Sequence, residues 1–246
     1  MSAESYFKEA SKILEQVVLT QMGKIKEASQ VLANAAANGQ SIFSFGASHS
    51  FILTEEIVYR AGGLMLINPI YPHGMNLFIR PLTLTSQLER TAGIGTVLLQ
   101  SSPARSGDVL IIASVSGRNP VVVDMALAAA EKKIRTIGIT SSAYNAVVKS
   151  RHPSGKKLND VCDIVIDNGA PCGDAIVEIP GFPQKTGPVS SFTGIAIVNA
   201  MVSETVALLA KRGIRPPVFM STNVDGGDDY NARHLKENKD RIHYLD

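Results

Sequence analysis

The residues best suited to chemistry lie in three short segments that combine serine hydroxyls with a predicted helix start. The segments are FGASHS (45–50), ASVSGRN (113–119) and TGPVSSFTG (186–194). Serine hydroxyls and the unpaired backbone N–H groups of a helix N-terminus can hold a phosphate with few lysine or arginine side chains. In any one segment alone an ordinary helix N-cap is the alternative for the serine, so the argument for an anion site depends on all three occurring together.

Other motifs that bind phosphate or supply a nucleophile fit the chain less well. The P-loop pattern GxxxxGK[ST] is absent, and no GxGxxG follows the first predicted strand. GASHS is similar to the GxSxG nucleophile elbow of hydrolases, with Gly46 and Ser48 in place, but Ser50 stands where the second glycine belongs. A hydrolase is therefore the weaker interpretation of this segment.

The elements that would position these segments alternate along the chain. Hydrophobic periodicity with glycine or proline stops predicts helices over residues 3–38, 51–60, 86–101, 120–133, 143–149 and 190–213. Apolar runs predict strands over residues 41–45, 64–68, 108–117, 134–140 and 162–167. Residues 68–86 are expected to be irregular, and the tail 214–246 is expected to be polar and to end irregularly.

Buried strands that alternate with helices indicate an α/β fold, a three-layer sandwich with a five-stranded parallel sheet. The carboxyl ends of such strands form the ligand crevice, so the three serine segments are expected to meet there and grip one bound group.

The composition limits the classes of function. The 246 residues suit one domain, and 24 Lys+Arg against 22 Asp+Glu leave no basic excess for nucleic-acid binding. No apolar run approaches the ~20 residues of a membrane span, and the N-terminus has no signal-peptide pattern. The two cysteines, Cys162 and Cys172, suit a reduced cytoplasmic protein without a disulfide framework. We therefore expect a cytoplasmic protein with a small-molecule partner and no nucleic-acid or membrane partner.

The segment DVLIIASVSGRNPVVVDMALAAAEKKIRTIGIT (108–140) resembles the signature of the SIS (sugar isomerase) domain. In that family a strand ends in Ser-x-Ser-Gly-x-(Ser/Asn), and an alanine-rich helix and a strand ending in Thr follow. FSFGASHS is similar to the family's first motif, a strand and then Gly-x-Gly-x-Ser, with Ser48 in place of the second glycine. VSSFTG resembles the stretch that opens the family's last helix, so the resemblance covers residues 10–212. It implies a flavodoxin-like fold and a phosphosugar ligand.

The resemblance also implies which residues bind the ligand. The side chains expected to hold the phosphate are Ser48, Ser50, Ser114, Ser116 and Asn119, with Ser190, Ser191 and Thr193 nearby. The backbone N–H groups of Gly117 and Arg118 would contribute, and His49 would contact substrate hydroxyls or cap the helix. The Arg118 side chain is unusual in the motif and could reach a second anionic group or remain solvated.

Aldose–ketose isomerisation through an enediol needs a base and an acid, for which Glu and His are the usual choices. Glu56 is the first candidate because several family enzymes carry a glutamate on the helix after the first motif; an ordinary surface glutamate is the alternative. Glu89 is a second carboxylate candidate, His73 could enter the site from the long loop, and His234 could reach the site of a neighbouring subunit. For any one histidine, a structural role is the alternative.

We expect a single SIS domain over residues 1–246, with an N-terminal helix (1–38) and a C-terminal tail (214–246), assembled as a homodimer or homotetramer. The long first helix could pack on a second subunit as well as on its own sheet. The expected activity is isomerisation of a phosphorylated sugar or amino-sugar derivative, similar to that of phosphoheptose isomerase, with no cofactor and no metal site. A lyase or etherase acting on an amino-sugar phosphate, and a sensor that only binds a phosphosugar, are the alternatives.

Overall fold

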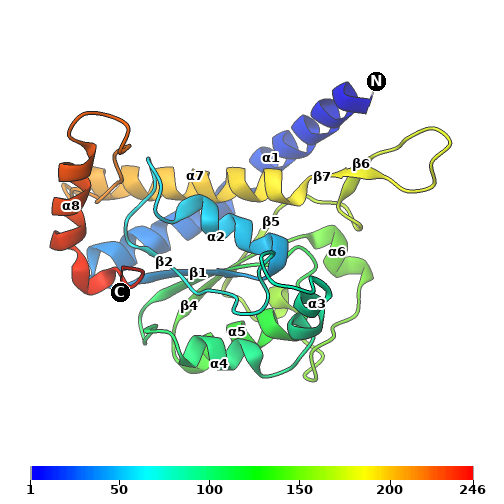
Figure 1. Cartoon of the computed structure of the whole chain (residues 1–246), viewed down its shortest axis with the longest axis horizontal. Helices are drawn as coiled ribbons and strands as arrows, with labels where there is room; N and C mark the ends of the chain where they lie inside the picture. Colours follow the sequence, from blue (N-terminus) through cyan, green and yellow to red (C-terminus); the bar gives the residue numbers. More distant parts are fainter. Residues whose placement is uncertain (1, 246) are drawn as a thin grey trace.

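A computed structural model describes residues 2–245 and shows a parallel sheet covered by helices on both faces (Figure 1). The strands of this sheet are β1 (Ile42–Gly46), β2 (Ile67–Pro69), β3 (Val109–Ala113), β4 (Arg135–Thr140) and β5 (Ile164–Asp167). They lie in the order β2-β1-β3-β4-β5, and every neighbouring pair is parallel. The predicted three-layer α/β fold with five parallel strands is confirmed.

Side chains alternate along each strand and give each face of the sheet its own core. In β1, Ile42 faces one core, and Phe43 and Phe45 face the other. The first core packs on α1 (Ser2–Ala37), α2 (Ile52–Ile57) and α7 (Ser190–Lys211). The second core packs on α4 (Ile94–Gln100) and α5 (Pro120–Glu131), which lie on the opposite side of the sheet in Figure 1. Since both faces are covered, the strands consist mostly of buried apolar residues.

The helix predicted over residues 86–101 is two helices, so that prediction is wrong. α3 (Thr83–Glu89) ends before α4 begins, and Gly93 lies between them with φ of +91°. A right-handed helix cannot continue through this backbone conformation. The N–H of Gly93 donates instead to the carboxylate of Asp124 on α5 (2.6 Å).

The tail contains a helix that the sequence patterns do not predict. Residues 214–246 contain α8 (Gly227–Glu237) and the short η3 turn (Lys239–Arg241). After η3 the chain returns to β2, where the Asn68 side chain donates to the Arg241 carbonyl (3.0 Å) and accepts from the His243 N–H (2.7 Å). The hydroxyl of Tyr244 donates to the Met65 carbonyl (2.9 Å).

Smaller elements complete the chain. They are the turns η1 (Ser48–Phe51) and η2 (Leu158–Asp160), α6 (Ser142–Val147), and an antiparallel hairpin of β6 (Ala175–Val177) and β7 (Thr186–Pro188). The hairpin, which the sequence patterns do not predict, projects from the body beside the N-terminal part of α1 (Figure 1).

α7 is long and apolar enough to cross a membrane by length and composition. Its residues Ile197, Met201 and Leu209 are buried in the core that it shares with α1 and α2. It is therefore packed as the core helix of a globular fold.

Candidate functional site

Two adjoining cavities lie at the carboxyl ends of β1 and β3. These neighbouring strands lead into helices on opposite faces of the sheet, which makes this the switch point where α/β sheets bind ligands. The larger cavity, here called the strand-end cavity, encloses about 210 Å³. Its polar lining consists of Ser48, His49, Ser50, Glu89, Ser114, Ser116, Asn119, Tyr144 and Asp174. The smaller inner pocket shares some of these residues and adds Asn168, Ser190 and Ser191. The three serine segments therefore meet, as their positions predict.

The turn after β1 is shaped by one glycine and one unusual serine. A Cβ on Gly46 would lie 2.8 Å from the backbone nitrogen of Phe51 and closer still to the Ser50 carbonyl, so only glycine fits. Ser48 has φ of +50°, in the left-handed region where glycine is favoured. The hydroxyl of Ser48 donates to the carboxylate of Glu89. Backbone outliers of this type cluster at functional sites, and here the outlier brings a hydroxyl to a carboxylate.

The turn after β3 leaves the N-terminus of α5 uncapped by any side chain within residues 2–245. Asn119, which stands at the N-cap position, uses its side chain elsewhere: its amide donates to Glu89 (2.8 Å), and its carbonyl oxygen accepts from Arg151 (3.0 Å). Pro120 has no N–H, so the available groups are the N–H groups of Val121 and Val122, which have no acceptor inside the helix; Val122 lines the cavity. This helix start can therefore receive an anion.

Two serine hydroxyls of the cavity are also free to bind a ligand. In the part of the chain that the structure describes, the hydroxyls of Ser50 and Ser116 form no hydrogen bond. The Ser114 hydroxyl accepts from the Gly117 N–H (3.2 Å) and keeps its own proton to donate. Gly117 has φ of +59°, and a Cβ there would lie 3.0 Å from the Thr140 hydroxyl, so the turn requires glycine.

The third serine segment already holds a carboxylate from the same chain. Asp174 accepts hydrogen bonds from the Ser190 hydroxyl (2.7 Å) and from the backbone N–H groups of Ser190 (2.8 Å) and Val189 (3.1 Å). It thus caps α7 and occupies the place where the segment was expected to meet phosphate. Sequence reasoning missed Asp174 because it precedes Ser190 by sixteen residues, across a hairpin that no periodic pattern reveals.

Comparison with known proteins agrees with this geometry. A family model described as the SIS domain matches residues 5–141, which contain the first two serine segments. The chain belongs to the SIS-domain family.

Relatives of this chain match it over nearly its full length. A UPF0309 protein of Shouchella clausii is 44% identical over 242 residues, covering 98% of each chain. A UPF0309 protein of Streptomyces griseus is 42% identical over 243 residues, covering 98% of this chain and 97% of the relative. The names of these relatives do not state an activity.

Solved structures with the same fold include two phosphoheptose isomerases. The protein from Neisseria gonorrhoeae has a TM-score of 0.52 and 15% identity, over 83% of this chain and 97% of that chain. The protein from Francisella tularensis has a TM-score of 0.56 and 12% identity, over 83% and 96% of the two chains. At these identities the likeness shows the fold.

The structure of the SIS domain separates the two candidate glutamates. Glu89 lines the strand-end cavity, with its two oxygens bound by Ser48 and Asn119. Glu56 lines neither cavity; it forms an ion pair with Arg60 (2.5 Å) and accepts from the Asn199 amide (2.8 Å). Only the second carboxylate candidate is therefore brought together with the serine segments.

The candidate histidines are also dispersed. His49 lines both cavities. His73 is exposed in the loop after β2 and lines neither cavity. His234 is buried in α8, where its Nδ1 lies 3.1 Å from Glu237. Figure 1 places α8 at the end of the molecule opposite the start of α7, so His234 is remote from the cavity of its own chain.

Two further residues that were predicted to bind the ligand, Thr193 and Arg118, line neither cavity. Thr193 is buried, lines neither cavity, and donates to the Val189 carbonyl (3.3 Å) inside α7. Arg118 lies at the turn before α5, and its Nε atom is buried without a hydrogen-bond partner among residues 2–245.

Proposed function

We propose that this SIS domain binds a phosphorylated sugar or amino-sugar derivative in the strand-end cavity and interconverts its aldose and ketose forms. The observation that carries the proposal is the meeting, in one cavity, of free serine hydroxyls, an uncapped helix N-terminus and a carboxylate. The fold shared with proteins named as phosphoheptose isomerases supports the same class of substrate.

The phosphate would lie against the turn after β3. Ser50, Ser114 and Ser116 supply hydroxyl donors there, and the first turn of α5 supplies backbone N–H groups and a partial positive charge. Ser48, Asn119 and Ser190 contribute less than the sequence predicts, since their donors are engaged with Glu89 and Asp174. The two carboxylates are acceptors and suit the hydroxyl groups of the sugar.

Glu89 is the proposed base. Isomerisation requires a base to remove the proton from the carbon beside the carbonyl, which gives an enediol, and to return it to the neighbouring carbon. The hydrogen bonds from Ser48 and Asn119 hold this carboxylate in one orientation in the cavity. His49, which borders both cavities, would carry the second proton between the two substrate oxygens. We propose Glu89 in preference to Glu56 because Glu56 is paired outside the cavity.

We also propose that a second copy of the chain covers the outer side of the N-terminal part of α1. Phe7 and Leu19 are 72% and 80% exposed, whereas Tyr6 and Ile13 pack against the chain's own fold. Exposed apolar side chains that the same chain leaves uncovered are available for contact with a second copy. A cytoplasmic location remains a prediction from the cysteine content.

A thermal-shift screen over sugar phosphates, followed by proton NMR in D₂O on each ligand found, tests the activity. Binding raises the unfolding temperature by mass action. Exchange of the proton beside the carbonyl would establish an isomerase, release of a substituent would establish a lyase or etherase, and binding without either would establish a sensor. If no sugar phosphate shifts the transition, the proposed function is wrong.

A further inference from the structure

Three arginines lie together beside the strand-end cavity, and we call them the arginine rim: Arg90, Arg118 and Arg151. Arg90 follows the last residue of α3, Arg118 precedes α5, and Arg151 lies in the loop after α6. Burial, followed by the charges of Arg118 and Arg90, lowers the pKa of Arg151, and Glu89 acts in the opposite direction. The charges of Arg118 and Arg90 therefore lie close enough to Arg151 to act on it.

The arginine rim has almost no partners of its own. Among residues 2–245, Arg118 and Arg90 form no side-chain hydrogen bond or ion pair, and Arg151 reaches only the neutral side-chain oxygen of Asn119 (3.0 Å). The nearby carboxylate of Glu89 is bound by Ser48 and Asn119 instead. The buried Nε of Arg118 is an unsatisfied donor, and such groups are rare unless a ligand or water completes them.

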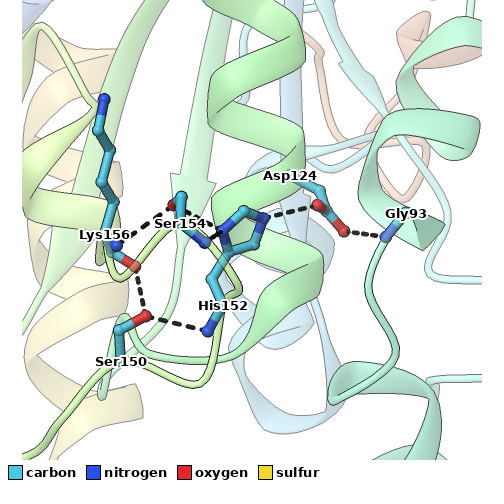
Figure 2. A network of polar contacts seen from close by, with 6 residues as sticks. All are labelled: Gly93, Asp124, Ser150, His152, Ser154 and Lys156. Atoms are coloured by element: carbon cyan, nitrogen blue, oxygen red, sulfur yellow. Dashed lines mark hydrogen bonds and ion pairs between the residues drawn. The ribbon is translucent and has the colours of Figure 1, made fainter.

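The arginine rim is held in place by the loop that carries Arg151. Figure 2 shows the ring of His152 between Ser154 and Asp124, with Nε2 lying 2.9 Å from the Asp124 carboxylate and Nδ1 2.7 Å from the Ser154 hydroxyl. Ser150 closes the same loop by donating to the Lys156 carbonyl (2.6 Å).

A backbone hydrogen bond then joins this loop to the turn before α5. The Arg151 N–H donates to the Arg118 carbonyl (2.9 Å), which joins the backbones of the two arginines. Asn119, which accepts from Arg151, itself lines the strand-end cavity. The arginine rim therefore adjoins the ligand site on an anchored backbone.

We propose that Arg118 and Arg151 form a second anion subsite, which takes a carboxylate or second phosphate carried by the sugar phosphate. Guanidinium groups bind both kinds of anion through paired, charge-assisted hydrogen bonds. The proposal rests on the proposed function, because the first phosphate must occupy the turn after β3. It restricts the substrate class to phosphorylated sugar acids, sugar bisphosphates and acidic amino-sugar phosphates.

The test compares two ligands that differ in one group. 6-Phosphogluconate and sorbitol 6-phosphate are open six-carbon chains with the same phosphate, and they carry a carboxylate or a CH₂OH at carbon 1. Calorimetric titration of the wild-type chain is expected to show the acid binding roughly tenfold or more tightly. Arg118→Gln should reduce that preference to about threefold or less and leave sorbitol 6-phosphate affinity nearly unchanged.

Control variants make the outcome specific. Arg135→Gln removes an exposed arginine at the start of β4, the opposite end of the sheet, and should keep the full preference. Arg151→Gln repeats the test from the neighbouring loop in case Arg118→Gln lowers the melting temperature.

The two proposals fail in different ways. Equal affinity of the two ligands, or an equal loss of both in Arg118→Gln, overturns the second subsite and leaves the sugar phosphate site standing. Failure of both ligands and of inorganic phosphate to bind overturns the subsite together with the proposed function.

Discussion

Glu89 and Glu56 are two glutamates of one chain whose surroundings assign them different roles. Glu89→Gln keeps the size of the side chain and removes the base, so proton exchange on a bound sugar phosphate should fall roughly 10²- to 10⁴-fold. Glu56→Gln disrupts a partly exposed ion pair outside the cavity and should leave exchange within about threefold of wild type. NMR in D₂O measures both rates. A large loss in Glu56→Gln with normal exchange in Glu89→Gln would reverse the assignment.

The free hydroxyl of Ser116 gives a second prediction. Ser116→Ala removes one donor to the proposed phosphate and no hydrogen bond within the described chain, so affinity for the sugar phosphate should fall about tenfold or more. The free energy of unfolding should change by less than ~0.5 kcal/mol. Ser203→Ala is the matched control, because that hydroxyl donates to the Asn199 carbonyl on the exposed side of α7. Unchanged affinity in Ser116→Ala would show that the anion lies elsewhere.

The two cysteines should differ in reactivity. Burial raises the pKa of Cys162 from 9.0 to about 12, whereas Cys172 is exposed. At pH 8, iodoacetamide should therefore label Cys172 and leave Cys162 unmodified, as mass spectrometry of digested protein can show. Above pH 9 the unfolded chain releases the Cys162 proton and the folded chain retains it, so this group lowers stability as the pH rises towards 12. Rapid labelling of Cys162 at pH 8 would contradict the raised pKa of this thiol.

At the scale of elements, the turn from β1 to η1 depends on the absence of a side chain at Gly46. Gly46→Ala places a methyl group against the backbone of Ser50 and Phe51, and the turn must move to admit it. We expect a loss of ~2 kcal/mol or more in unfolding free energy, together with weaker ligand binding. Gly23→Ala in α1 has no heavy atom within 4 Å of the new Cβ and should instead stabilise the protein by ~0.5–1 kcal/mol. Denaturant unfolding of both variants measures the contrast.

Sequence patterns predict best the elements that carry a regular spacing of apolar residues along the chain. The helices expected over 3–38 and 190–213 correspond to α1 (Ser2–Ala37) and α7 (Ser190–Lys211) because both carry long apolar stripes and end near a glycine. The break at Gly93 was missed because it depends on Asp124, thirty-one residues away. The β6–β7 hairpin and α8 were missed for a similar reason. Their sequences are short or polar, and contacts with distant parts of the chain stabilise them.

The candidate site shows the same division. The convergence of the three serine segments follows from strand order, and the sequence predicts it. Strand order does not predict the hydrogen-bond partners of those serines. Glu89 is forty-one residues from Ser48 in the sequence, and Asp174 is sixteen residues from Ser190. Sequence reasoning therefore located the cavity, but it put Glu56 ahead of Glu89 and did not identify Asp174.

At the scale of the whole molecule, α1 extends beyond the sheet, and its outer side remains uncovered (Figure 1). Leu19→Glu should shift the mass measured by light scattering towards the monomer, because a charge would enter the proposed contact between copies. Val147→Glu is the control, since Val147 is 66% exposed on α6, away from α1. A wild-type mass equal to one chain, or an assembly insensitive to Leu19→Glu, would contradict self-association through this surface.

The C-terminal segment after η3 lies along β2, which is an edge strand of the sheet. Uncovered edge strands recruit strands from other molecules and start aggregation. The hydrogen bonds of Asn68 with Arg241 and His243 thus hold the C-terminal segment on β2, where it covers this edge against strands of other molecules. A chain shortened to residue 237 would lose the segment that covers β2 but keep every residue of the strand-end cavity. We therefore expect such a chain to aggregate even though its ligand site is intact.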